Sequence, residues 1–539
     1  MASDIASAGD QVVDNTAENV PGVKVEWKAW EYAAQLVRSI ELLFDQLLTP
    51  KIHLQSNQPL NIQRLIIEKG RFHSWAYGAG LVAIGGSRRP LHGLLEGFLG
   101  SKVCRCLEDI QEILSPEASK VTLRRDSILG TSLQKHLQQL YSFFPDDDRR
   151  ISDQIFCHSM VETENAADLD SLSSSSLVLA YYDVEATAAM KRIKILCDTS
   201  EAQRQENQKL FIPIDELKLD KGKSTGRSTG LHVVTKDDTL ESRSVLIEWK
   251  KYEGYWDTEI GNTLFNRVEM LTLFLRTASK SAEVLDLRIL DCLGYCHDEK
   301  NMRLGFVFAM PLSTSQQRSY VHLNACFSLT SSPPLLGDRF RLAQKLCTAV
   351  FEFHKAQWFH KSFSSYNILL FPDVELANEA AGGTPDISSY TILAPYIIGF
   401  NHSRPGKPDE FSEPAHLSLE LQRYQHPDYK NRPMQKFQRT YDYYSLGIVL
   451  LEIGLWFPLS GLLEQHKQLT MDEFSAEIRK TYCPQLGGFM GSIYRDAVLS
   501  LLGGSSGNYA DEPGMEGSPL MQLVEFQSGI LTQLEQCRA

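Results

Sequence analysis

Apolar side chains recur every three or four residues in three stretches of the N-terminal part of the chain, and a fourth stretch, at 62–72, has a broader apolar face. These stripes are Leu36, Ile40, Leu43 and Leu47; Ile62, Leu65, Ile66 and Phe72; Val103, Leu107, Ile110 and Leu114; and Leu129, Leu133, Leu137 and Leu140. This spacing places the apolar residues on one face of an α-helix. Four amphipathic helices predict an all-α helical bundle over about residues 25–145. The polar residues 1–24 are predicted to be disordered.

The pattern is lost after this part. Pro145–Ser176 is polar and acidic, with three consecutive aspartates at 146–148 and four consecutive serines at 173–176. Such a composition buries too little apolar surface to offset the entropy of ordering the chain. We therefore predict a linker and connecting segment over residues 146–205.

A different order of elements follows. Short β-branched runs at 231–235 and 244–249 precede a helical pattern at 263–278, and an apolar strand follows at 306–310. Strands first and helices afterwards predict an α+β unit with two lobes. The small lobe would span about residues 206–312 and the large, mainly helical lobe about residues 313–539. The predicted fold class is therefore multidomain, with an all-α bundle followed by an α+β bilobal domain.

Composition narrows the classes of partner. Hydrophobic residues make up 43% of the 539 residues and charged residues 22%, which is ordinary for a globular protein. The formal net charge of −13 argues against non-specific binding to nucleic acid or to anionic membranes. We expect other proteins as partners, including a second copy of the chain.

Cysteine spacing and hydropathy bear on location. The ten cysteines include Cys104 with Cys106 and Cys292 with Cys296, but no second pair lies at zinc-finger spacing. We interpret them as reduced thiols, with no metal site, and we see no signal peptide in the first 22 residues. The apolar run Tyr443–Leu463 contains Glu452, and a central acid costs about 2.5–3.5 kcal/mol on membrane insertion. We therefore predict a buried helix, a cytoplasmic protein and no membrane partner.

The segment His360–Leu370 carries the strongest candidate chemistry. It follows a helical pattern at 339–355 and ends in an apolar strand. It resembles the protein-kinase catalytic loop His-Arg-Asp-Leu-x-x-x-Asn, aligned without a gap. The resemblance implies that Asn367 is the metal-binding asparagine and that Ser362 occupies the position of the catalytic aspartate. A serine hydroxyl is not ionised at neutral pH and cannot act as the base.

A second block, Tyr396–Arg404, resembles the kinase strand and loop that carry Asp-Phe-Gly. Only Phe400 is preserved, and Gly399 stands where the family has the magnesium-binding aspartate. Magnesium prefers oxygen ligands, and glycine has no carboxylate to offer. The resemblance therefore implies that the main metal site is missing. The wide separation of the two blocks implies an insertion at about residues 372–389.

Further resemblances place structural residues. Tyr424–Tyr429 resembles the Ala-Pro-Glu segment, with Asp428 in place of the glutamate. Asp442–Glu452 closely resembles the central helix of the large kinase lobe, in which the family's first aspartate anchors the catalytic-loop backbone. Val245–Lys250 resembles the strand of the ATP-binding lysine. The resemblance then implies an ion pair of Lys250 with Glu269.

The segment before that strand matches the family poorly. Gly222, Gly226 and Gly230 are spaced by four, which does not fit Gly-x-Gly-x-x-Gly. We predict that this stretch rich in serine, threonine and glycine is a flexible loop. Nucleotide is then expected to bind weakly at most, through Lys250, Glu269 and Asn367, without magnesium and without any required cofactor.

The N-terminal part resembles another family more faintly. Arg71–Trp75 and the helical patterns between Leu91 and Leu114 are similar to the HeLo domains of filamentous fungi. Those domains act in cell death during heterokaryon incompatibility, through an apolar N-terminal helix that attacks membranes. Residues 1–22 are polar here, so the resemblance supports a bundle more than it supports membrane attack.

Three readings of function follow from these resemblances. The leading one is a pseudokinase that acts as a signalling or scaffold protein, with the bundle as effector or assembly module and a link to fungal incompatibility signalling. The second is an atypical active kinase that phosphorylates Ser or Thr and recruits an acid such as Asp373 or Asp386. The third makes the bundle an oligomerisation module only.

Overall fold

The structure is a computed structural model. It describes residues 23–48, 60–84, 87–88, 97–115, 128–162, 165–174, 182–196, 210–220, 226–236, 239–252, 259–280, 285–311, 320–329, 332–372, 391–405, 419–431, 437–503 and 519–539. The chain divides into two compact units, Met1–Met160 (unit 1) and Val161–Ala539 (unit 2). Each unit is described by itself.

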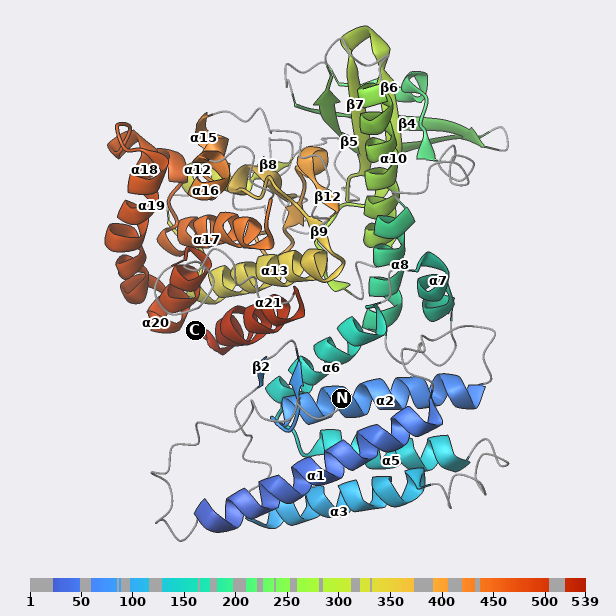
Figure 1. The fold of residues 1–539 in the computed structure, drawn as a ribbon. Helices are drawn as coiled ribbons and strands as arrows, with labels where there is room; N and C mark the ends of the chain where they lie inside the picture. Colours follow the sequence, from blue (N-terminus) through green and yellow to red (C-terminus); the bar gives the residue numbers. More distant parts are fainter. Residues whose placement is uncertain are drawn as a thin grey trace, which may run out of the picture. The chain divides into compact units, whose positions relative to one another are not determined.

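Unit 1 is helical. Its elements are α1 (Val23–Leu47), α2 (Leu60–Gly78), the short strands β1 (Ala83–Ile84) and β2 (Ser87–Arg88), α3 (Gly97–Leu114), α5 (Ile128–Ser142) and α6 (Asp146–Met160). Helix α1 packs against α3, and α2 packs against both α5 and α6 (Figure 1). The sequence prediction of helices in this part of the chain is confirmed.

The predicted stripes hold for most of these helices. Val103, Leu107, Ile110 and Leu114 are buried, as are the described members of the α5 stripe, Leu133, Leu137 and Leu140. In α1 the buried line differs, because Leu43 and Leu47 are half-exposed whereas Phe44 and Leu48 are buried. The aromatic Phe44 ring packs on Phe72, with ring centroids 5.9 Å apart. A large aromatic side chain buries more area than leucine does, so α1 is rotated to place Phe44 against its neighbours.

The region predicted as a linker is helical instead. Helix α6 begins at the three aspartates, whose negative charges are favourable at a helix N-terminus. Ile151, Ile155 and Phe156 follow at helical spacing and are buried. Beyond it lie α7 (Ala166–Ser174) and α8 (Tyr182–Leu196), which belong to unit 2. The expectation that this segment buries little apolar surface was wrong for α6, because its mean composition concealed an apolar stripe between the charges. The division between the two units, at Met160 and Val161, does fall inside the predicted connecting segment.

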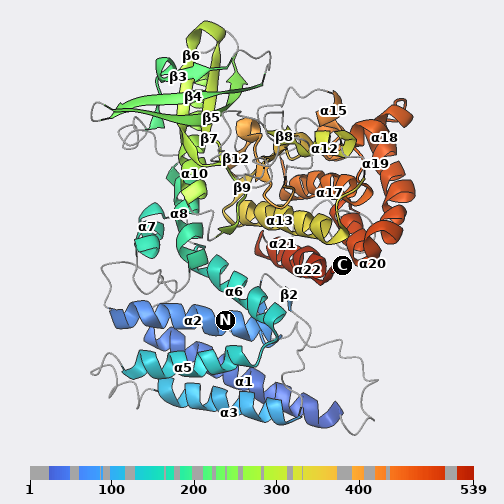
Figure 2. The same ribbon diagram turned by 180° about the vertical axis from the view of Figure 1, so that it is seen from behind.

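Unit 2 contains a five-stranded antiparallel sheet, which with helix α10 forms the sheet region (210–311). The strand order is β3 (Leu217–Leu219), β4 (Arg227–Lys236), β5 (Thr239–Lys251), β7 (Arg303–Ala309) and β6 (Cys292–Asp298). Helix α10 (Glu259–Lys280) packs on β6, and α8 packs along α10, as Figure 2 shows. The flexible loop expected before residue 231 is partly wrong, because β4 already begins at Arg227 and pairs with β5.

The rest of unit 2 is mainly helical and forms the helical region (320–539). Its elements are β8 (Val321–His322), α12 (Leu323–Leu329), α13 (Leu336–Lys355), β9 (Trp358–Phe359), β10 (Ile368–Leu370), β11 (Tyr396–Ile397), β12 (Arg404–Pro405), α15 (Leu419–Gln422), α16 (Pro427–Asn431), α17 (Arg439–Leu455), α18 (Leu459–Gln465), α19 (Met471–Glu477), α20 (Cys483–Leu501), α21 (Pro519–Phe526) and α22 (Thr532–Gln536). An antiparallel sheet followed by helices is the α+β arrangement that the sequence predicted at this coarser level.

Helix α17 is the centre of the helical region. It packs against α13 and α20, and every residue from Tyr441 to Gly454 is buried. Across the described ranges, no single helix has the length and hydropathy to cross a membrane. Helices α17 and α18 reach that length and hydropathy only as a pair, and they meet at a bend of 90°. The uniformly apolar run therefore belongs to a protein core in this structure.

Candidate functional site

The loop that begins at His360 is tied to α17 through a buried carboxylate. Asp442 is fully buried, and its two oxygens accept the backbone N–H groups of His360 and Lys361, each at 2.8 Å. His354 of α13 adds its Nε2 at 3.0 Å. We call Asp442, His354, His360 and Lys361 the Asp442 cluster. It gives the carboxylate three donors and fixes the start of the loop.

These donors decide the charge of the cluster. Hydrogen bonds from His354 and from the backbone hold the pKa of Asp442 below its usual range, although burial opposes them. Burial lowers the pKa of His354, which is therefore neutral and donates its Nε2–H. His360 also has a pKa lowered by burial, to about 4. Its Nε2–H donates to the carbonyl oxygen of Ile398 at 3.1 Å. The negative charge of Asp442 is thus stabilised by hydrogen bonds from two backbone N–H groups and from His354.

Phe400 and His360 belong to the core beneath the loop. Both are buried, and their rings lie 5.1 Å apart. Phe400 also stacks on Phe353 of α13 at 5.6 Å. The two segments that the sequence singled out therefore lie side by side, although 40 residues separate these two rings in the sequence. Their contact is structural, because both rings are surrounded by apolar side chains.

Ser362 and Asn367 lie on the same loop and are linked through it. Asn367 donates from Nδ2 to the carbonyl oxygen of Ser362 at 2.6 Å. The hydroxyl of Ser362 is enclosed and accepts no hydrogen bond in this structure. Because residue 362 is a serine, the loop has no carboxylate at this position to accept a proton.

Gly399 is packed against the amide of Asn367. Its backbone has φ of +94°, a conformation that favours glycine. A Cβ atom at this position would lie 2.3 Å from Asn367 Nδ2 and 2.5 Å from its Cγ. Its N–H donates to Glu248 Oε2 at 3.0 Å. A side chain at 399 would therefore strain the backbone and would require the Asn367 amide to move.

A guanidinium occupies the other side of Asn367. Arg227, at the start of β4, donates to Asn367 Oδ1 and to the carbonyl oxygen of Tyr366 at 3.1 Å. Its Nη1 also lies 3.4 Å from His322 Nδ1. Burial, and then the charge of Arg227, lowers the pKa of His322 to about 4, so this ring is a neutral acceptor. We call Arg227, His322, Tyr366 and Asn367 the Arg227 cluster.

Glu248 is the buried acid of this cleft. It is 2% exposed and lies on β5 directly opposite Arg227 in the sheet register. Burial raises its pKa, while the charge of Arg227 and the amides of Gly399 and Phe400 oppose that rise. Glu248 therefore faces the loop at 399, where the sequence analysis had expected a lysine to face the site.

The expected ion pair between Lys250 and Glu269 is not formed. Lys250 Nζ donates to the carbonyl oxygen of Asn401 at 3.0 Å. Glu269 accepts the hydroxyl of Tyr295 at 2.6 Å, within the sheet region. Glu269 is thus occupied by the neighbouring strand β6, while Lys250 reaches the loop after Gly399. The prediction fails because a pairing across two elements depends on how the helix packs, which spacing alone does not give.

A second buried acid of α17, Glu452, accepts hydrogen bonds from two neighbouring segments of the helical region. Glu452 Oε1 accepts the N–H of Leu459 at 2.7 Å and the hydroxyl of Tyr424 at 2.8 Å. The Tyr424 hydroxyl is also 2.9 Å from Ser365 Oγ, on the loop. Burial raises the pKa of Glu452 to about 7. This side chain therefore links α17 to the loop in a second place.

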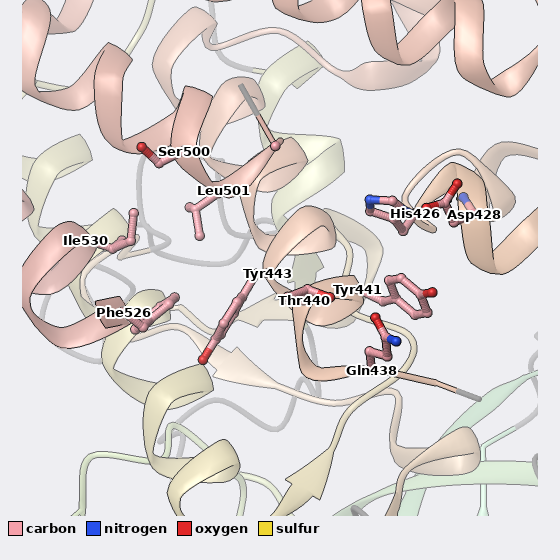
Figure 3. A pocket seen from close by; sticks show the side chains of 11 residues that line it. His426, Asp428, Gln438, Thr440, Tyr441, Tyr443, Ser500, Leu501, Phe526 and Ile530 are labelled. Atoms are coloured by element: carbon pink, nitrogen blue, oxygen red, sulfur yellow. Dashed lines mark hydrogen bonds between the residues drawn. The ribbon is translucent and has the colours of Figure 1, made fainter. Parts of the chain in front are cut away.

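Asp428 does not share this burial. It is exposed in the first turn of α16, and its N–H donates to His426 Nδ1 at 3.2 Å. With His426 it lines a small cavity of about 80 Å³ beside α17. Figure 3 shows its apolar end, where Tyr443 and Phe526 stack with ring centroids 4.4 Å apart. This cavity is too small for a substrate and lies apart from the residues described above.

The larger cavity brings three of the predicted site residues together: Ser362, Asn367 and Gly399. It has a volume of about 340 Å³, and Arg227, Glu248, Lys361, Ser362, Asn367, Gly399 and Asn401 are among its lining residues. Burial lowers the pKa of Lys361 to about 7. Lys250 and Glu269 are not part of its lining. In the described part of the chain no group of three or more His, Cys, Asp or Glu is arranged to hold a metal ion.

Sequence reasoning missed Arg227 and Glu248. A signal for Glu248 existed, because alternation along β5 puts Leu246, Glu248 and Lys250 on one face and the apolar Val245, Ile247 and Trp249 on the other. An acid among buried apolar residues needs a partner. Arg227 gave no comparable signal, since it follows a stretch that reads as a loop.

Some predicted residues lie outside the described ranges: residues 1–22, Gly222, Asp373 and Asp386. Comparison with known proteins adds nothing further to the geometry. No protein-family model matches the chain, and no curated protein matches its sequence.

Proposed function

We propose that unit 2 contains a protein-kinase-like domain that does not transfer phosphate and acts as a signalling or scaffold module. The ordered sequence blocks support the resemblance, and the buried contact of Asp442 with the amides of His360 and Lys361 is the anchoring that the resemblance implies. An antiparallel sheet followed by helices is compatible with a bilobal kinase-like domain.

The packing at Gly399 carries the proposal that this domain is inactive. Phosphoryl transfer by kinases uses a metal-binding aspartate and a catalytic-loop aspartate together. Here Ser362 lacks the second, and a Cβ at 399 would overlap the Asn367 amide at 2.3 Å. The first aspartate is absent from the sequence, and a side chain in its place would strain the backbone at 399 and displace the Asn367 amide. Weak nucleotide binding that is indifferent to magnesium remains the expectation for this cleft.

Phosphate transfer from labelled ATP tests the proposal directly. The full-length protein should transfer no more phosphate, to itself or to a generic substrate, than its Lys250→Met variant. The double variant Ser362→Asp with Gly399→Asp should also stay inactive, because the new side chain at 399 strains the backbone and displaces the Asn367 amide. Transfer clearly above the Lys250→Met control would contradict the proposal.

An atypical active kinase is the alternative function. It would need an acid from the insertion, such as Asp373 or Asp386. In the same assay, activity that disappears on Asp373→Asn or Asp386→Asn would establish it.

For unit 1 we propose an effector or assembly role, on the basis of its helices and of the similarity of Arg71–Trp75 to HeLo domains. The aromatic members of that motif, Phe72 and Trp75, are fully buried, and Trp75 stacks on Phe144 at 6.0 Å. The motif thus supports the packing of the helices, which is compatible with a shared helical domain. On the same resemblance we propose that this role is linked to fungal cell-death or incompatibility signalling.

A further inference from the structure

The two regions of unit 2 are joined across the cleft by a row of polar contacts. Besides those of Arg227, Gly399 N–H donates to Glu248 Oε2 at 3.0 Å. Next to it, Lys250 Nζ donates to Asn401 O at 3.0 Å, and Asn401 Nδ2 donates to Trp249 O at 3.2 Å. All of them run between the start of β4 or the end of β5 and the loops of the helical region. The cleft is therefore bridged by the chain's own side chains.

Arg227 has a special place in this row. Its guanidinium donates to the side-chain oxygen of Asn367 and to the backbone oxygen of Tyr366. These are acceptors that a cation entering the cleft would otherwise use. A guanidinium is always charged and presents several donors in a fixed plane, so it can bind two oxygens at once. Lysine has a point charge on a flexible stem and is a poorer replacement for such a fork.

We propose that Arg227 is an internal latch that holds the cleft of unit 2 closed without a ligand, its guanidinium bound to Asn367 Oδ1 and Tyr366 O. The inference rests on the proposed non-catalytic function and adds how the cleft is kept in one conformation. A latched cleft presents one fixed surface to other proteins, irrespective of nucleotide. Opening requires the release of Arg227 from Tyr366 and Asn367.

Hydrogen–deuterium exchange of the full-length protein tests the latch. Removing the fork in Arg227→Gln should speed exchange of the amides of Asn367 and Gly399 by about 10-fold or more, the effect expected on losing charge-assisted hydrogen bonds. Exchange within α17 should not change. Arg227→Lys, which keeps the charge but not the fork, should be intermediate. Arg243→Gln is the matched control, because Arg243 lies on the same sheet in an exposed ion pair with Asp291 at 3.0 Å.

The outcomes separate the latch from the proposed function. Unchanged exchange at Asn367 and Gly399 in a folded Arg227→Gln protein would overturn the latch. Acceleration that extends equally into α17 would also overturn it, because Arg227 would then stabilise the fold as a whole. Neither outcome bears on phosphate transfer, which is measured separately and which alone decides whether the domain is inactive.

Discussion

The Asp442 cluster and the Arg227 cluster hold the same loop at opposite ends and with opposite charge. At the start of the loop a carboxylate accepts two backbone N–H groups, those of His360 and Lys361. At its end a guanidinium donates to two oxygens, those of Tyr366 and Asn367. Ser362 lies between them. The comparison teaches that a loop of this shape can be fixed by a buried carboxylate at one end and a partly buried guanidinium at the other, and still lack the acid needed for chemistry.

Removing the first anchor should have the largest effect on stability. We expect Asp442→Ala to lower the free energy of unfolding of unit 2 by about 3–5 kcal/mol, because three buried donors lose their acceptor. Urea denaturation followed by tryptophan fluorescence would measure it. Asp428→Ala, at an exposed acid in α16, is the control and should change stability by less than about 0.5 kcal/mol. Equal small losses in both variants would show that Asp442 does not anchor the loop.

The next change tests the tight packing of Gly399 against the Asn367 amide. Gly399→Ala should cost about 2–4 kcal/mol, because it forces a side chain into the left-handed region and onto the Asn367 amide. Gly226→Ala is a matched control in the same cleft, since a Cβ there would meet nothing within 4 Å. Thermal melts of both variants would compare them. A Gly399→Ala protein as stable as Gly226→Ala would show that position 399 tolerates a side chain without strain.

The smallest effect sharpens the contrast between the two buried acids of α17. Asp442 is ionised, whereas burial raises the pKa of Glu452 to about 7 in the folded state. The folded state therefore binds a proton at Glu452 more tightly than the unfolded state does. The contribution of this proton to the free energy of unfolding is lost as the pH rises from about 4.5 toward 7. Between pH 5 and pH 8 the wild type should lose about 2 kcal/mol more than Glu452→Gln. Urea denaturation at both pH values would measure the difference. An equal change in the free energy of unfolding for the wild type and for Glu452→Gln would refute the prediction.

Much of the fold was accessible from periodicity. The stripes of α3 and α5, the strand at 244–249 and the helix at 339–355 follow from apolar spacing, because a single element buries one face whatever its partner. Within the segment 146–205, the expectation of little buried apolar surface failed for α6. Its composition is polar on average, but three of its apolar residues are buried, and the helix packs against α2. In α1 the line of buried residues shifted because Phe44 met Phe72, a partner that local sequence does not reveal.

For the candidate site, too, some features could be predicted from the sequence and others could not. By itself the sequence determined which groups are absent, since a serine at 362 and a glycine at 399 carry no carboxylate in any fold. It also placed Asp442 at the start of a helix near the loop. Only the tertiary structure decided which charges meet, pairing Arg227 with Asn367, Glu248 with Gly399 and Lys250 with Asn401. The physical reason is that local spacing fixes what a side chain can donate or accept, whereas burial and contact between distant segments determine its partner.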